Sequence, residues 1–200
     1  MKKPVGLIAV AAAIAAAAWV SGQTARPSTL FDSGQLLRDL RVLSADDMQG
    51  RQVGTAGGEK ARAYIVERFR ALGLQPVGQA FTHPFSFRSG RGGAGAERSG
   101  VNIVGRIGGA RDTQRYLVIT AHYDHLGERN GQVFNGADDN ASGTAALFAV
   151  AQYFRAHQPA HSLLFVALDA EEAGLQGARA FVASPPVPAE SLALNLNMDM

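Results

Sequence analysis

The spacing of apolar positions predicts four helices along this chain. In each of them, apolar side chains recur every three or four residues, as in a helix that buries one face. The expected helices cover 31–43, 58–72, 142–157 and 175–183. Gly73 stands where a helix often ends on a left-handed residue, which supports the end of the second helix.

Short β-rich runs alternate with the later helices. Leu163–Leu168 is continuously apolar, as expected of a strand that is buried on both faces. Further strands are expected at 101–107, 116–121 and 192–200. Strands that alternate with helices predict an α/β fold, here a mixed, mostly parallel twisted sheet with helices on both faces.

The segment between the second helix and the first of these strands has a weaker pattern. Three Phe and one His alternate with other residues from Phe81 to Phe87, which predicts a half-buried strand. Pro84 cannot donate a ladder hydrogen bond, so the strand is expected at the edge of a sheet. Residues 88–100 are rich in Gly, Arg and Ser and have no apolar period, so we expect a flexible surface loop there.

The N-terminus has the order of features found in a secretory signal. Lys2 and Lys3 precede the apolar run Val5–Val20, which is followed by the small residues Ser21 and Gly22. The run is short for a membrane-spanning helix, which needs about 20 residues. We therefore expect a signal peptide, or alternatively an uncleaved anchor, at 1–22, a linker at 23–30 and one domain at 31–200. A periplasmic or secreted location follows, with a membrane as partner only if the segment stays uncleaved.

Composition and charge narrow the class of protein. Hydrophobic residues make up 46% of the chain and charged residues 18%, which is typical of a globular protein. Of 19 Lys and Arg, Lys2 and Lys3 belong to the expected signal, which leaves 17 against 17 Asp and Glu. No basic patch is evident, so nucleic acid is not expected as a partner. The absence of Cys excludes disulfides and lipid attachment at a lipobox.

Histidine and acidic residues cluster where the expected elements meet. Ala121–Gly127 and Asp169–Gly174 each follow a strand directly, and Asn135–Gly143 directly precedes a helix. Asp199 ends the last expected strand. Because the carboxyl ends of strands in an open α/β sheet form the usual ligand site, these clusters predict a shared site for metal.

The residue types suit zinc chemistry. Zinc binds imidazole and carboxylate, and two zinc ions about 3.5–4 Å apart are best held with a bridging carboxylate. Hydrolysis also needs a free carboxylate that moves a proton. Adjacent Glu171 and Glu172 could divide these roles, one as a ligand and one as the general base.

Each cluster also has an ordinary explanation. His122 and Asp124 could form a surface pair in a turn. Acidic pairs such as Asp138 with Asp139, or Glu171 with Glu172, are common at helix starts, where the helix dipole favours negative charge. All of these would have to coincide on one side of one sheet, so we favour the metal site.

The same four motifs resemble those of metallopeptidase family twenty-eight, which contains bacterial leucyl aminopeptidases and aminopeptidase Y. They are His122–Gly127, Gly136–Gly143, Glu171–Gly177 and Asn197–Asp199, and the similarity in order and spacing runs from about Leu37 to Met200. The resemblance implies a zinc exopeptidase-like fold and two Zn²⁺ ions. It implies that His122 and Asp199 ligate one zinc, Glu172 ligates the other, and Asp139 bridges both. A cis peptide bond at Asp139-Asn140 is also implied.

The resemblance implies an activity as well. The chain would hydrolyse peptide substrates, most simply as an aminopeptidase, with a metal-bound hydroxide and Glu171 as general acid/base. Asp124 would support catalysis by orienting the His122 ring. Other amide chemistry on this fold, such as glutaminyl cyclisation, stays open, as do carboxypeptidase activity and a non-catalytic binding module.

One ligand of the family pattern is absent from this sequence. The resemblance implies a further His well downstream of Asp199, whereas the sequence ends at Met200. None of the remaining histidines is expected to substitute for it: His83, His125, His157 and His161. We therefore expect a domain that is incomplete at its C-terminus and whose own activity is in doubt.

Overall fold

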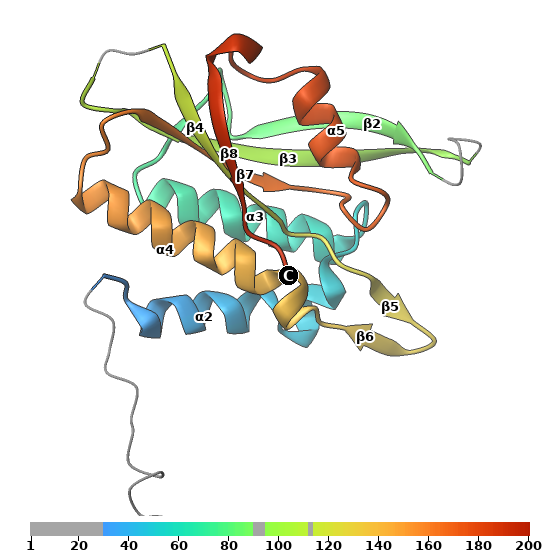
Figure 1. Cartoon of the computed structure of the whole chain (residues 1–200). Coiled ribbons are helices and arrows are strands. Elements are labelled where there is room, and N and C mark those ends of the chain that lie inside the picture. Colours follow the sequence, from blue (N-terminus) through green and yellow to red (C-terminus); the bar gives the residue numbers. More distant parts are fainter. Residues whose placement is uncertain (1–29, 90–94, 112–113) are drawn as a thin grey trace, which may run out of the picture.

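The computed structural model describes residues 30–89, 95–111 and 114–200, which form three layers (Figure 1). A six-stranded sheet lies in the middle, with α2, α3 and α4 on one face and α5 on the other. The expected signal or anchor at 1–22, and all of the expected linker except Leu30, lie outside the described residues. Within the described ranges, no helix has the length and apolar character needed to cross a membrane.

The four predicted helices are present, with ends that differ from the prediction by at most two residues. Asp32 and Thr55 cap two of them, because their side chains accept the backbone N–H groups of Gln35 and Gly58, respectively. Gly73, which follows the second helix, has the left-handed φ of 71° that its position predicted. The helices are α2 (Ser33–Leu43), α3 (Ala56–Ala71), α4 (Gly143–Ala156) and α5 (Gln176–Ala183).

The sheet is mixed, as predicted, but its antiparallel strand pairs outnumber the parallel ones, so it is not mostly parallel as expected. Its strand order is β1-β3-β7-β4-β8, and β2 also pairs with β3. The β7–β4 and β4–β8 pairs are parallel, whereas β3 is antiparallel to each of its partners. The strands are β1 (Gln75–Pro76), β2 (Thr82–Arg88), β3 (Glu97–Ile107), β4 (Tyr116–His122), β7 (Ser162–Leu168) and β8 (Leu192–Asn197).

The prediction of a loop at 88–100 was wrong at both ends, because Arg88 ends β2 and residues 97–100 belong to β3. β3 begins at Glu97, and its first residues pair with the end of β2. Hydrogen bonds between the backbones of β2 and β3 hold the start of β3 in place, so its side chains need no regular spacing of apolar residues. Gly100 lies opposite Phe85, and a Cβ at that position would come within 2.4 Å of the Phe85 ring. The glycine that suggested a loop therefore makes room for an aromatic ring across the strands.

A small hairpin was not predicted. It consists of β5 (Gly127–Arg129) and β6 (Gln132–Phe134), joined by Asn130 and Gly131. Both turn residues have positive φ, of 53° and 74°, as a two-residue type I′ turn requires. Each strand has only three residues, too few for an alternation of polar and apolar positions to stand out.

The core lies on both faces of the sheet, and β7 contributes to each of them. Phe165 packs with Phe69 and Phe148 in the larger cluster, under α3 and α4. On the other face, Leu164 and neighbouring side chains pack against Phe181 of α5. The continuously apolar strand is therefore buried on both sides, as expected.

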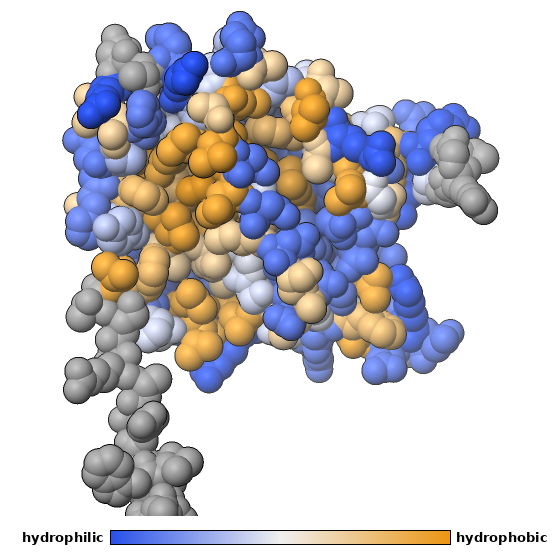
Figure 2. Space-filling view, viewed as in Figure 1, coloured by the Kyte–Doolittle hydropathy of each residue, from blue (hydrophilic) through white to orange (hydrophobic). Residues whose placement is uncertain are grey.

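β8 is more exposed than a core strand. Leu194 and Leu196 of this strand are 61% and 55% exposed. Among the described strands, β8 pairs only with β4. Figure 2 shows apolar side chains gathered around the position of β8.

Candidate metal centre

Parallel strands bring the predicted site residues to one edge of the sheet. His122 is the last residue of β4, Glu171 and Glu172 follow β7, and Asp199 follows β8. Because these three strands run in the same direction, their carboxyl ends lie together. Asp139 comes from the helical turn Ala137–Ser142, immediately before α4.

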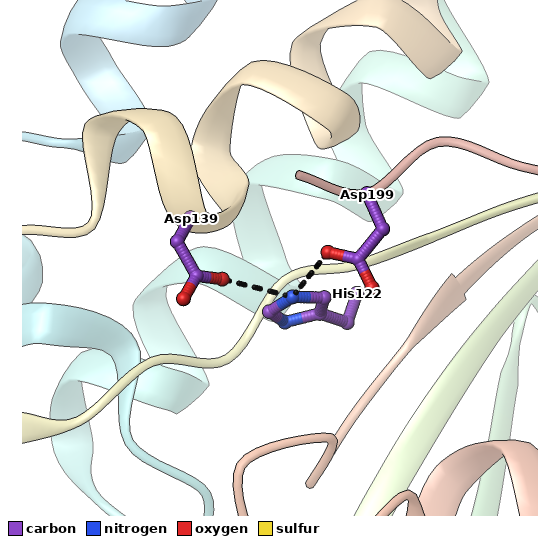
Figure 3. A group of neighbouring side chains, drawn as sticks. All are labelled: His122, Asp139 and Asp199. Carbon is purple, nitrogen blue, oxygen red and sulfur yellow. Dashed lines mark hydrogen bonds and ion pairs between the residues drawn. The ribbon is translucent and has the colours of Figure 1, made fainter.

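The first cluster consists of His122, Asp139 and Asp199 (Figure 3). Nε2 of His122 lies 3.1 Å from Oδ1 of Asp139 and 3.1 Å from Oδ1 of Asp199. The His122 ring is buried, whereas the two carboxylates are partly accessible. Its Nδ1 lies 3.1 Å from the backbone oxygen of Asp124. An Nδ1–H donated to that oxygen leaves the Nε2 lone pair free to bind a cation between the two carboxylates.

The second cluster consists of His125, Asp139 and Glu172. Nδ1 of His125 lies 2.7 Å from Oε1 of Glu172 and 3.9 Å from Oδ2 of Asp139. Asp139 thus belongs to both clusters and turns one oxygen toward each: Oδ1 toward His122 and Oδ2 toward His125. A carboxylate in this position has the geometry of a bridge between two cations.

The chain holds Asp139 in place through its neighbour Asn140. The side-chain amide of Asn140 donates to the backbone oxygen of Met198 at 2.9 Å and accepts the Gly143 N–H at 3.0 Å. The Asp139-Asn140 peptide bond is cis, the form that the family resemblance implied. The turn before α4 is therefore tied directly to the residue that precedes Asp199.

Asp124 is fully buried and connects the ends of β4 and β7. Its Oδ1 accepts the backbone N–H of Glu171 at 2.9 Å, and its Oδ2 accepts that of Glu172 at 3.3 Å. The nearest approach of its carboxylate to the His122 ring is 3.6 Å, between Oδ1 and Nδ1. In this structure the Asp124 backbone oxygen lies nearer to the ring, and the carboxylate mainly holds the segment that carries the two glutamates.

Glu171 lies beside the clusters without joining either of them. It lines a groove of about 550 Å³ together with His122, Asp199 and apolar residues of α5 and β8. Burial raises the pKa of Glu171, the nearby His122 ring opposes this, and Asp124, Glu172 and Asp199 add to it. A carboxyl group with a raised pKa, facing a groove, is suited to take up and release a proton.

Negative charge dominates the site. Burial of the His122 ring lowers its pKa, but the carboxylates of Asp124, Asp199 and Glu171 outweigh burial and raise this pKa to about 9. Bound divalent cations would compensate this charge and, as the largest local charges, set the protonation of the ring. Imidazole and carboxylate groups at this spacing fit zinc, which binds both types of ligand.

Arg51 supports the site and was missed by the sequence analysis. Its side chain is fully buried and donates to four backbone oxygens, those of Leu43, Tyr123, Asn135 and Gly136. Burial lowers the pKa of Arg51 to about 10, although Asp124 and Asp139 act in the opposite direction. A single Arg after a glycine carries no recognisable motif, so only the fold reveals that it joins the two metal-cluster segments.

His125 was also missed as a site residue. We expected no other histidine to substitute for a ligand, yet the structure places Nδ1 of His125 beside Glu172 and Asp139. The first motif contained the signal, because His125 lies only three residues after His122.

Comparison with known proteins gives a family match for the C-terminal part of the chain. Residues 102–200 match the model of peptidase family M28. A probable zinc metalloprotease of Pyricularia oryzae is 38% identical over 88 residues, which cover 41% of this chain and 17% of the relative. A vacuolar membrane protease of Candida albicans is 33% identical over 132 residues, 66% of this chain and 15% of the relative. The chain thus spans less than a quarter of the curated relatives it matches.

Solved structures with this fold include two kinds of enzyme. A leucine aminopeptidase precursor from Bacteroides thetaiotaomicron superposes with a TM-score of 0.68 at 19% identity, over 85% of this chain and 62% of that one. A glutaminyl cyclase from Porphyromonas gingivalis gives a TM-score of 0.72 at 18% identity, over 86% and 62%. At these identities the likeness establishes the zinc exopeptidase-like fold and does not choose between the two activities.

The expected location was wrong. We expected a periplasmic or secreted protein, whereas the named relatives include vacuolar membrane proteases of Candida albicans and Schizosaccharomyces japonicus. The basic residues and apolar run of residues 1–22 are features of a targeting signal, and they do not specify the compartment that the protein finally reaches.

Proposed function

Because residues 102–200 belong to peptidase family M28, we propose that this protein is a zinc-dependent exopeptidase, and specifically an aminopeptidase. The observation that carries the proposal is the pair of clusters that share Asp139, with a free glutamate, Glu171, beside them. Its substrate is a peptide. We also propose that residues 31–200 belong to a single peptidase domain, since the described elements pack around one sheet.

The ligand roles follow from the clusters. His122 and Asp199 hold one zinc ion, Glu172 helps to hold a second, and Asp139 bridges the two. Zinc bound there supplies Lewis acidity toward the scissile carbonyl and lowers the pKa of water. A count of two ions is part of this proposal, and its support is that Asp139 turns a separate oxygen toward each cluster.

Proton transfer during hydrolysis is assigned to the side chain of Glu171. Glu171 accepts a proton from the attacking water and gives it to the leaving amine. The raised pKa of Glu171 favours this exchange near neutral pH, since an acid–base group works best when its pKa is close to the working pH. Asp124 fixes the backbone of Glu171 and Glu172, so the proton carrier and the ligand keep a constant relative position.

Glutaminyl cyclisation is the second candidate, favoured by the fold shared with the cyclase of Porphyromonas gingivalis. It differs from peptide hydrolysis in its product, since it closes the N-terminal glutamine on itself and releases ammonia without adding water.

A substrate panel tests the proposal. The purified protein is assayed with amino-acid amides, N-blocked peptides and a peptide with N-terminal glutamine, with and without added zinc. We expect hydrolysis of unblocked substrates that is lost on chelation and restored by zinc. Cyclisation without hydrolysis would instead establish the alternative.

Two adjacent aspartates provide a matched pair of variants for the same assay. Asp139→Asn should abolish hydrolysis and lower the bound zinc, because Asp139 belongs to both clusters. Asp138→Asn should change neither, because Asp138 is exposed and belongs to neither cluster. Equal activity of the two variants would contradict the proposed role of Asp139.

A further inference from the structure

We propose that His125 is a protein ligand of the second metal position, which it forms together with Asp139 and Glu172. The inference rests on the proposed function, because it assumes that this site binds zinc. It adds a ligand to the four that the sequence motifs identified.

Position and burial of His125 carry the argument. The residue is only 9% exposed, and its Nδ1 is buried without a hydrogen-bond partner of acceptable geometry. That atom points into the space between two carboxylates, 2.7 Å from Oε1 of Glu172 and 3.9 Å from Oδ2 of Asp139. Ligand atoms bound tetrahedrally to zinc at about 2.0–2.1 Å lie roughly 3.3 Å apart. The two distances bracket this spacing, so a small adjustment brings all three groups onto one cation.

The fold holds the His125 ring in this direction. Gly136 packs directly against it, and a Cβ at Gly136 would lie 2.5 Å from both Cγ and Cδ2 of the ring. Gly136 also has a left-handed φ of 52°, which glycine adopts readily. Its backbone oxygen accepts a hydrogen bond from Arg51 at 2.8 Å. Gly136, which packs behind the His125 ring, is therefore held in place by the buried Arg51 side chain. This fixes the orientation of the ring, as a preorganised ligand requires.

A different role would leave a different chemical signature. If His125 only donated a hydrogen bond to Glu172, its Nδ1 would carry the proton and Nε2 would be bare. As a zinc ligand through Nδ1, the same ring must carry its proton on Nε2. The contact at 2.7 Å fails the angular requirement for a hydrogen bond, which favours the second arrangement.

Nuclear magnetic resonance distinguishes the two states in the unmodified protein. The side-chain ¹⁵N signals of metal-free protein are recorded at one fixed pH while Zn²⁺ is added. We expect the Nδ1 signal of His125 to move to the range of a metal-bound nitrogen, with the proton on Nε2. A protonated Nδ1 at saturating zinc would overturn the inference, and no variant is needed for this result.

Metal titration of variants gives a second, independent measurement. Calorimetry with Zn²⁺ alone should show two ions per wild-type chain. His125→Ala should weaken one of them by more than about 100-fold, beyond the roughly 10–100-fold that loss of an outer partner costs. The control is His157→Ala, because His157 is exposed and stacks on Tyr153. It should bind both ions as the wild type does.

The outcomes separate this inference from the proposed function. Two tightly bound ions in His125→Ala would overturn the role of His125 even in an active peptidase, whereas a single ion in the wild type would overturn both this role and the proposed two-ion site. Two ions held through His125, in a protein that hydrolyses no substrate in the panel, would contradict the proposed function and leave this inference in place.

Discussion

Oδ1 of Asp124 accepts the backbone N–H of Glu171 at 2.9 Å, which joins two residues 47 positions apart in the sequence. The second oxygen of the same carboxylate accepts the N–H of Glu172. A fully buried group at the end of β4 thus sets the position of the segment after β7. The proposed metal ligand His122 and the proposed proton carrier Glu171 are aligned through it.

Replacing Asp124 should disturb that alignment. Asp124→Asn puts an N–H₂ group where one of the two backbone N–H groups now finds an acceptor, so one hydrogen bond becomes a repulsive contact. We expect zinc affinity to fall by roughly 10–100-fold, as for other outer partners of metal ligands. Competition with a chelator of known affinity measures this fall. The exposed Asp47→Asn is the control, and equal affinities of the two variants would refute the role of Asp124.

Removing the charge of Glu171 should affect the rate and not the metal. Glu171→Gln keeps the size of the side chain but cannot accept a proton, so we expect kcat to fall by about 10²–10⁴-fold. Zinc content should stay unchanged, because Glu171 belongs to neither cluster. Steady-state kinetics and metal analysis are compared with those of Glu128→Gln, in an exposed residue of β5. Normal turnover with zinc bound would remove Glu171 from the mechanism.

Arg51 should be among the most sensitive positions for stability. Arg51→Met leaves four backbone oxygens without their donor and removes the positive charge near Asp124 and Asp139. We expect the free energy of unfolding to fall by roughly 3–5 kcal/mol, as when one partner of a buried charged network is lost. Urea denaturation measures this, with the exposed Arg41→Met as control. A loss below about 1 kcal/mol would show that the network contributes little.

Asp169 should make stability depend on pH. Burial raises the pKa of Asp169 to about 6, against 3.8 as its ordinary value. The folded state therefore binds this proton more tightly than the unfolded state does, and the resulting stability is full below about pH 4 and lost as pH rises through 6. Its size is about 2–3 kcal/mol, since each pKa unit corresponds to about 1.4 kcal/mol.

The variant Asp169→Asn isolates that contribution. It has no carboxyl group to titrate, so its stability relative to the wild type should improve between pH 4 and pH 7 by about the same amount. Denaturation curves at several pH values give the difference. A constant difference across this range would mean that the Asp169 carboxyl does not titrate as described.

The sequence predicted the parts of the molecule that repeat a pattern. Helices with an apolar stripe and the apolar strand Leu163–Leu168 lie where predicted, because their burial imposes a period on the side chains. The proposed ligands His122, Asp139, Glu172 and Asp199 were identifiable because each belongs to a compact motif at the end of an element.

The role of Arg51 could not be predicted in the same way, and neither could the orientation of the His125 ring. The role of Arg51 depends on four backbone oxygens from three separate parts of the chain. Every residue has a backbone oxygen, so these contacts produce no recognisable sequence pattern. The proposed role of His125 depends on the direction of its ring, against which Gly136 packs. The start of β3 was missed for a related reason, since main-chain pairing with β2 holds residues of almost any type.

The position of Asp199 means that a bound metal would link two strands of the sheet. Asp199 lies at the end of β8, which pairs with β4 alone among the described strands, and it faces His122 across 77 positions of sequence. A cation held by these two residues would fasten the end of an outer strand to an interior one. Metal binding would then indicate that folding is complete, because Asp199 and His122 come together only after β8 has paired with β4.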